Sequence, residues 1–280
     1  MGIGLLRNGK LWSLLKKISP KPIFRKSRGI HLAVKFIGFF GFLSIPHILN
    51  KLGANPEIFR TWEQIAKEFW TNPGHHLFSL WTTFHLGVIS IFISLAIGLF
   101  FGILFAFFDR WIGPFETVAK FIWSIPLIVV AVYLNIFLAN TTLYIIITGV
   151  FLGYFPILSF TYKKAIEENE GIISLVSSFN LSKIAEFRFF RLREIFGNLA
   201  VPLAISVPLA YIGVTMGEFT VGRVAGSDDC GLGSDFQFAM QYSKFEKVYV
   251  AIILMVFLVF ISGVIFDEIV KLKENRPNRR

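Results

Sequence analysis

The sequence predicts an all-α integral membrane protein with about six transmembrane helices. Apolar residues make up 54% of the 280 residues and charged residues only 16%, and the mean hydropathy is +0.64. A soluble protein of this size typically carries about 25% charged residues, because it covers its surface with polar groups. The composition therefore argues against an ordinary soluble enzyme and excludes a disordered chain. The single cysteine, Cys230, excludes an internal disulfide.

Six apolar segments are long enough to cross a bilayer, since a membrane-spanning helix needs about 20 such residues. They lie near 30–49, 80–108, 117–138, 142–162, 196–217 and 248–269. Only a few residues separate the third segment from the fourth, which predicts a tight helical hairpin. Segment 51–78 is polar and contains a predicted surface helix at Glu57–Trp70. A charged stretch, 163–195, separates the fourth segment from the fifth.

These boundaries predict four parts of the chain. They are a basic arm at 1–29, a first span with the surface helix at 30–74, a core of five spans at 75–270 and a tail at 271–280.

Lys and Arg are distributed unevenly between the two sides of the predicted membrane. With the N-terminus in the cytoplasm, 20 of the 28 lie in cytoplasmic segments and six in external ones. Positive residues are retained on the cytoplasmic side, so the pattern predicts a multi-pass inner-membrane protein with both termini in the cytoplasm. The net charge of +10 is therefore attributed to orientation and not to nucleic acid binding. The basic arm is either a solvated orientation signal or a segment that lies on anionic lipid.

Small residues and prolines indicate how the predicted spans pack. The small residues recur at helical spacing on one face, which allows a neighbouring helix to approach closely. They are Ser90, Ser94, Gly98, Gly102 and Ala106, with Gly149 and Gly153 in the fourth span. Prolines are expected to interrupt the spans, because they free backbone carbonyls. They are Pro126, Pro156, Pro202 and Pro208.

The charged stretch between the fourth and fifth spans carries a helix–turn–helix pattern. Its first half has an apolar stripe formed by Ile172, Leu175, Val176 and Phe179. Asn180 is suited to ending this helix, and Ser182 to capping a second one with Glu186 near its positive end. The second helix is expected to set Phe187 and Phe190 against Arg188 and Arg191. Two interpretations stay open. The segment is either an inert amphipathic loop that lies on lipid, or a site that a soluble subunit binds in order to move the attached helices.

Several short motifs follow one another in an order typical of one family. They are Ser124-Ile125-Pro126, Phe155-Pro156-Ile157-Leu158, the loop around residues 174–193, Ile212-Gly213-Val214-Thr215-Met216-Gly217-Glu218-Phe219 and Gly231-Leu232-Gly233. Over about residues 75–270 the chain resembles the permease subunit of binding-protein-dependent ABC importers, in the nitrate, sulfonate and taurine group. Its loop pattern, E-A-A-x3-G-x9-I-x-L-P, is matched literally only at Leu192. The other matched positions hold Ser174, Leu175, Val176, Asn180, Phe190 and Arg193.

The resemblance implies a bundle of the type I ABC importer permease kind and assigns roles to residues. The ATPase-coupling residues would be Ser174, Leu175, Val176, Phe179, Asn180, Leu181, Phe190 and Leu192. The solute pathway would include Ser124, Pro126, Tyr211 and Glu218. The side that faces the binding protein would include Asp228, Asp229, Gly231 and Gly233. From the residues alone, the favoured interpretation of Glu218 is an interfacial acid that bonds its neighbours or anchors the loop. The favoured interpretation of Asp228 and Asp229 is a solvated acidic loop.

The resemblance also implies partners. Separate ATPase subunits would hydrolyse ATP, and a periplasmic or lipid-anchored binding protein would deliver a sulfonate, taurine, nitrate or a vitamin precursor. A second permease copy would complete the pore, with a homodimer favoured over a heterodimer. No catalytic residue, cofactor, metal site or nucleic acid partner is expected on this chain.

The alternative function is a self-contained secondary transporter or channel. It would show inverted repeats or charged residues at mid-membrane depth. Neither pattern is found, because apart from Lys35 and Lys120 the predicted spans are almost free of charge. A membrane anchor would not need interrupted spans. A membrane-embedded enzyme is not supported either, because the sequence contains no group of acid and base residues suited to catalysis.

Overall fold

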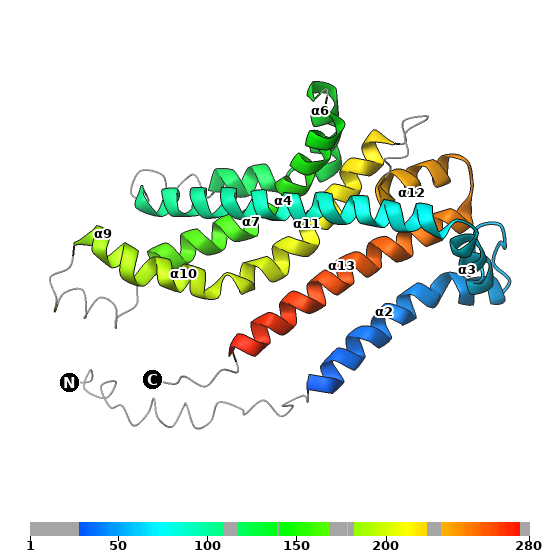
Figure 1. The fold of residues 1–280 in the computed structure, drawn as a ribbon, viewed down its shortest axis with the longest axis horizontal. Coiled ribbons are helices and arrows are strands. Elements are labelled where there is room, and N and C mark those ends of the chain that lie inside the picture. Colours follow the sequence, from blue (N-terminus) through cyan, green and yellow to red (C-terminus); the bar gives the residue numbers. More distant parts are fainter. Residues whose placement is uncertain are drawn as a thin grey trace, which may run out of the picture.

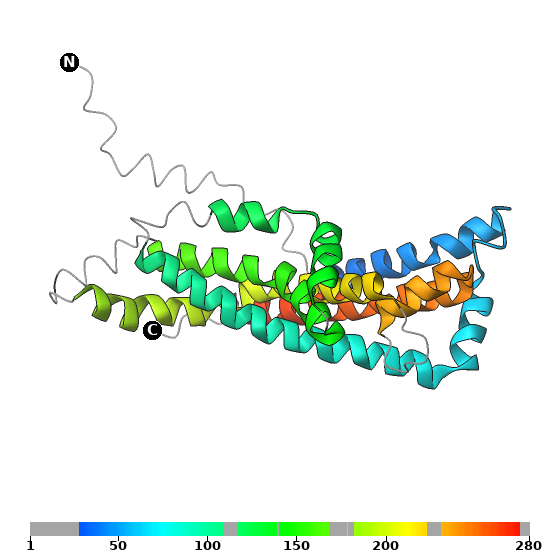
Figure 2. The same ribbon diagram turned by 90° about the horizontal axis from the view of Figure 1, so that it is seen from above.

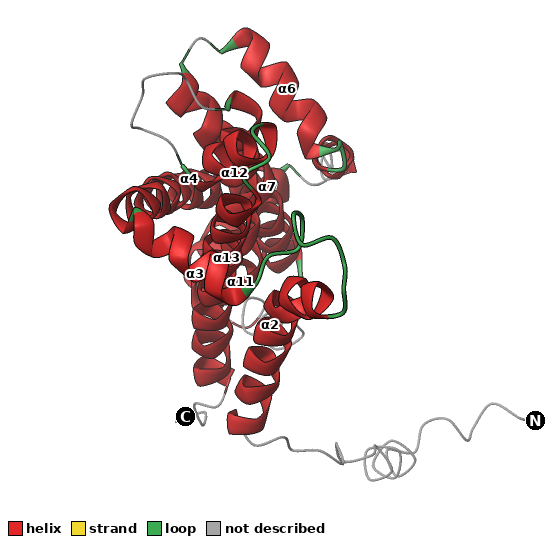
Figure 3. Cartoon of the chain, turned by 90° about the vertical axis from the view of Figure 1, so that its right-hand side faces the viewer, coloured by secondary structure: helices red, strands yellow, loops and turns green. Residues whose placement is uncertain are grey.

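A computed structural model shows the chain as a bundle of long helices (Figure 3). It describes residues 28–108, 117–138, 140–167, 178, 182–222 and 231–274, and none of these residues forms a strand. Within this part of the chain, five helices are long and apolar enough to span a membrane, and a sixth span results if one bent pair is counted as a single crossing. The predicted all-α class and the number of spans are thereby confirmed.

The first helices form the margin of the bundle. Helix α2 (Arg28–Lys51) has only 6% of its most apolar stretch buried and meets the rest of the protein through rings such as Phe39, which stacks on Phe260. Helix α3 (Trp62–Thr71) begins at a capping box in which Thr61 and Gln64 satisfy each other's backbone N–H groups. The surface helix predicted at Glu57–Trp70 is therefore present, but it begins later than predicted, at Trp62, directly after the capping residue Thr61.

Three helices make the core: α4 (Pro73–Phe107), α7 (Thr141–Ile166) and α11 (Ala200–Val221). The predicted small-residue faces lie where these helices meet. A Cβ atom at Gly102 would lie 2.6 Å from Thr161 Cβ, and one at Gly149 would lie 2.6 Å from Ser90 Oγ. Side chains larger than hydrogen do not fit at these two positions, so the glycines set the spacing between α7 and α4.

The predicted third span is a broken helix. Residues Thr117–Trp123 and helix α6 (Leu127–Phe137) are bent by 84° relative to each other, with Pro126 at the start of α6. Proline has no N–H and disfavours the helical conformation of the residue before it, so the first helix ends there. Figures 1 and 2 show α6 standing across the bundle.

The other three prolines do not end their helices. Pro156 and Pro208 lie inside the continuous helices α7 and α11, and Pro202 is buried near the start of α11.

The remaining helices mark the two ends of the bundle (Figure 1). At one end lie α3 and α12 (Leu232–Gln241). At the other end lie α9 (Lys183–Glu186), the π-helix η1 (Phe187–Arg191) and α10 (Leu192–Asn198). The last helix, α13 (Phe245–Glu274), returns from the α12 end towards the α9 end, and α2 begins towards that same end.

Candidate functional site

The most deeply buried carboxylate of the core belongs to Glu218, in the last turn of α11. Its exposed fraction is 1%. The Thr83 hydroxyl of α4 donates to the carboxylate, with Oγ1 2.9 Å from Oε2 and 3.0 Å from Oε1, and the backbone N–H of Gly233 donates to Oε2 at 2.9 Å. The predicted end of the fifth span at residue 217 is too early, because α11 continues to Val221 and Glu218 lies inside it.

These contacts tie Glu218 to the first turn of α12. A carboxylate is stabilised at a helix N-terminus, where backbone N–H groups have no partner within the helix. The same Thr83 hydroxyl accepts a hydrogen bond from Leu232 N at 2.9 Å, and Ser234 Oγ donates to the backbone oxygen of Glu218 at 3.2 Å. One threonine therefore bridges α4, α11 and α12.

Close approach of the backbone explains the Gly231-Leu232-Gly233 motif. A Cβ atom at Gly231 would lie 2.0 Å from Glu218 Oε1, and one at Gly233 would lie 2.1 Å from the backbone oxygen of Thr215. Both positions therefore require glycine.

A second carboxylate, which belongs to α12, is also held by α4. Asp235 accepts a hydrogen bond from Ser79 Oγ at 2.5 Å, and its Oδ1 lies 3.0 Å from His75 Nε2. His75, Ser79 and Thr83 are four residues apart and share one face of α4. We refer to the five side chains of His75, Ser79, Thr83, Glu218 and Asp235 as the α12 cluster.

Two adjacent histidines lie at the start of α4, close to the α12 cluster. His75 and His76 lie in the first turn of α4, where His76 is buried and stacks on Phe69 with ring centroids 5.8 Å apart. Among the described residues, no group of three His, Cys, Asp or Glu side chains is placed to hold a metal ion.

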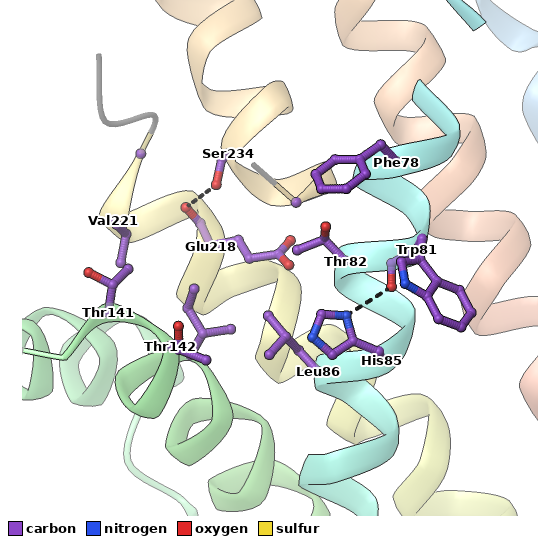
Figure 4. Close-up of a pocket in the computed structure, with 13 residues that line it drawn as sticks. Phe78, Trp81, Thr82, His85, Leu86, Thr141, Thr142, Glu218, Val221 and Ser234 are labelled. Atoms are coloured by element: carbon purple, nitrogen blue, oxygen red, sulfur yellow. Dashed lines mark hydrogen bonds between the residues drawn. The ribbon is translucent and has the colours of Figure 1, made fainter. Parts of the chain in front are cut away.

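A cavity of about 520 Å³ opens beside the α12 cluster (Figure 4). It lies between α4, the start of α7, the end of α11 and the start of α12. Its size falls in the range of pockets that hold small molecules. Its lining residues are Phe78, Trp81, Thr82, His85, Leu86, Thr141, Thr142, Ile145, Glu218, Val221, Gly222, Gly231 and Ser234. We refer to it as the α12 cavity.

The α12 cavity combines aromatic rings with hydroxyl groups. Trp81 and Phe78 contribute rings, and Thr82, Thr141 and Thr142 contribute hydroxyls. Such a lining offers hydrogen bonds and apolar contact to a small solute without a dedicated charge, because the Glu218 carboxylate is already bonded to Thr83 and Gly233.

The predicted pathway residues are only partly brought together. Glu218 lines the cavity beside Gly231, with Gly233 bonded to it. Tyr211 is buried elsewhere, where its ring packs against Gly87 and stacks on Phe84. Ser124 and Pro126 lie exposed at the bend of the broken helix, and neither lines the α12 cavity.

Most of the predicted coupling residues lie outside the described residues. These are Ser174, Leu175, Val176, Phe179, Asn180 and Leu181, and the same holds for Asp228 and Asp229 on the other side. Phe190 and Leu192 are described, in η1 and at the start of α10, and both are half-buried. Ser182 accepts a hydrogen bond from Ala185 N at 3.3 Å, which confirms the predicted cap of the second loop helix.

The predicted arrangement of that second helix is wrong at Arg191. Instead of lying on the polar face with Arg188, the Arg191 side chain is buried, while Phe189 is exposed. A π-helix has more residues per turn than an α-helix, so it rotates the side chains away from the faces that α-helical spacing predicts.

Of the five members of the α12 cluster, the sequence patterns select only Glu218 as a candidate site residue. Thr83 and Asp235 carry no motif, and their partners lie 135 to 160 residues away in the chain. Thr83 lies seven residues, or about two helical turns, before Ser90, and Ser79 lies four residues before Thr83. Helical spacing therefore places both on the small-residue face of α4, and this pattern is a signal that could select them.

The chain matches a known protein family. Residues 95–277 match the family described as "Binding-protein-dependent transport system inner membrane component". The matched region contains the last third of α4, all of α7, α11, α12 and α13, and the 163–195 loop. No curated protein matches the chain.

Proposed function

Since the chain belongs to the family of inner-membrane components of binding-protein-dependent transport systems, we propose that it forms the solute pathway of an ATP-driven importer and is driven through its 163–195 loop. As a member of this family it is a multi-pass inner-membrane permease component of a type I ABC transport system, not itself an enzyme. The observation that carries the proposal is the family match, which includes the last third of α4, the long apolar helices α7, α11 and α13, and the 163–195 loop.

The proposed orientation follows from the distribution of positive charge. The α9 end of the bundle faces the cytoplasm, and the α12 end faces the binding protein. The two ends then have separate partners. An ATPase docks around Ser174, Leu175, Val176, Phe179, Asn180, Leu181, Phe190 and Leu192, and a periplasmic or lipid-anchored binding protein docks near Asp228, Asp229, Gly231 and Gly233.

The proposed pathway begins at the α12 cavity. A solute released at the α12 end meets the hydroxyls of Thr82, Thr141 and Thr142 before it reaches the core. Glu218 holds α12 in place beside this cavity through Thr83, so its contribution is to shape the wall. Ser124, Pro126 and Tyr211 remain proposed pathway residues. Closure of the ATPases would move the core helices as packed units and open the path alternately to each side.

The proposed assembly contains a second copy of the permease, as a homodimer, together with the lipid membrane. ATP is used by the partner ATPase, and no cofactor is assigned to this chain. The proposed solute belongs to the sulfonate, taurine, nitrate or vitamin-precursor classes, in keeping with the motif resemblance of residues 124–233 to that group.

Co-purification tests the proposal. The full-length chain is expressed together with the products of its neighbouring genes, among which we expect a P-loop ATPase and a binding protein. The protein is extracted in detergent and purified through a tag on the permease. We expect the ATPase to co-purify and its ATP hydrolysis to increase when the loaded binding protein is added to proteoliposomes. Deletion of 171–193 should abolish both results, whereas deletion of the 271–280 tail should change neither. Uptake that persists without an ATPase would support a self-contained transporter instead.

A further inference from the structure

Arg191 is buried although it lies in the polar segment between two spans. Its exposed fraction is 7%. Nε and Nη2 donate to Glu186 Oε1 at 3.2 and 3.0 Å, and Nη1 donates to the backbone oxygen of Glu167. We refer to Arg191, Glu186 and the Glu167 carbonyl as the Arg191 clip. A buried guanidinium without partners would carry a large desolvation cost, so these contacts are required where Arg191 lies.

The clip joins the loop to a core helix. Glu167 directly follows the last residue of α7, where backbone carbonyls lack partners within the helix and attract positive charge. The planar guanidinium reaches this carbonyl and the Glu186 carboxylate at the same time, which a single ammonium group does less well. The end of α7 is thereby fixed to η1.

Two further contacts attach the same segment to the core helices. Lys164 of α7 pairs with Glu167 and lies 3.8 Å from Glu194 of α10. The Phe187 ring of η1 meets the Phe107 ring at the end of α4, with centroids 4.4 Å apart. The segment from α9 to α10 is therefore attached to α7 and to α4, whose glycine-spaced interface runs towards the α12 cavity.

We propose that Arg191 is a positioning residue that transmits movement of the 163–195 loop to α7. This inference rests on the proposed function, in which an ATPase moves that loop. A displacement of η1 pulls the end of α7 through the clip. Because α7 and α4 meet without room for a Cβ atom at Gly102, they shift as packed bodies, and the walls of the α12 cavity move with them.

The test measures how accessible the α12 cavity is to a labelling reagent when the Arg191 clip, at the other end of the bundle, has been broken by substitution. Full-length protein, with Cys230 replaced by serine and Thr82→Cys as reporter, is reconstituted with the co-purified ATPase. The labelling rate of the reporter by a membrane-impermeant maleimide is measured with and without ATP and vanadate. Arg191→Met should reduce the ATP-dependent change in labelling rate about tenfold, while the ATPase still co-purifies and the melting temperature stays close to that of the parent. The matched control Arg188→Met, an exposed arginine of the same π-helix, should keep the full response.

Partner variants make the test independent of one substitution. Glu186→Gln should reduce the response in the same direction, and combining it with Arg191→Met should add no further loss, because both remove one interaction. Arg191→Lys should restore only part of the response. If Arg191→Met does not fold, Glu186→Gln and Arg191→Lys decide the question, and an unchanged response in both overturns the proposal.

Failure of the clip and failure of the proposed function give different results. If the parent responds to ATP and Arg191→Met responds equally, the transport function stands and the clip is wrong. If no ATPase co-purifies with the parent, or ATP does not change its labelling, the proposed coupling fails and the clip falls with it.

Discussion

Each end of the bundle contains a buried charged side chain, and the two are satisfied in different ways. At the α12 end, Glu218 receives hydrogen bonds from Thr83 and from the backbone of Gly233, so α4, α11 and α12 are joined at spacings that only glycine permits. At the α9 end, Arg191 is held by one carboxylate and one carbonyl, on short helical pieces. The difference indicates a rigid α12 end and an α9 end attached at few points, which is able to move as a unit.

The largest expected effect is from Glu218→Ala. The hydroxyl of Thr83 and the N–H of Gly233 would lose their acceptor, at a cost of about 1–3 kcal/mol for each buried donor left unsatisfied. We expect a marked fall in the midpoint of thermal unfolding in detergent micelles and a loss of correctly inserted protein. Glu218→Gln keeps the shape and one acceptor oxygen, so it should be milder. Equal stability of Glu218→Ala and the wild type would show that the α12 end is not rigid.

Gly233→Ala should follow in size. The added Cβ would meet the Thr215 backbone oxygen at 2.1 Å, and overpacking of this kind costs about 1–3 kcal/mol. Gly197→Ala is the matched control, because it lies in α10 with open space around it and replaces a helical glycine by a better helix former. The first variant should melt at a lower temperature than the wild type and the second at the same or a higher temperature. The reverse order would contradict the comparison.

Thr83→Val tests the bridging hydroxyl alone. Valine fills the same space but leaves Leu232 N without its acceptor and removes a donor to Glu218, a loss of about 1 kcal/mol for hydrogen bonds between membrane helices. Thr83→Ser keeps the hydroxyl and should stay closer to the wild type. The two melting temperatures measured side by side decide whether the hydroxyl or the packing matters.

The smallest effect is expected at the α9 end, from Lys164→Met. Its ion pairs with Glu167 and Glu194 are partly exposed, and such pairs contribute about 0–1 kcal/mol. The stability difference from the wild type should shrink further as salt is added, whereas the effect of Glu218→Ala should not depend on salt because that carboxylate is buried. A large, salt-independent loss in Lys164→Met would mean that both ends are equally rigid.

Sequence patterns predict those parts of the fold that depend on local spacing. The apolar segments, the small-residue faces of α4 and α7 and the cap at Ser182 follow from residues a few positions apart. The 84° bend after Trp123 is harder, because Pro126 and Pro208 have the same local chemistry. Only Pro126 lies at a break between two helices, while Pro208 lies within α11, which continues to Val221.

The candidate site divides in the same way. Glu218, Gly231 and Gly233 are selected by motif and meet in the structure, whereas Thr83 and Asp235 enter only through contacts between distant helices. Tyr211 packs against Gly87 and does not line the α12 cavity. Its position depends on which face of α11 turns towards α4.

Composition and spacing alone determined that this protein is a multi-helix membrane bundle with close-packed small-residue faces, because solvation by lipid acts on every residue of a span. Tertiary structure decided how its buried charges are satisfied. A hydrogen bond between Thr83 and Glu218, or between Arg191 and the end of α7, exists only once two helices have met. Helical periodicity describes each helix by itself and contains no information about which helix lies opposite.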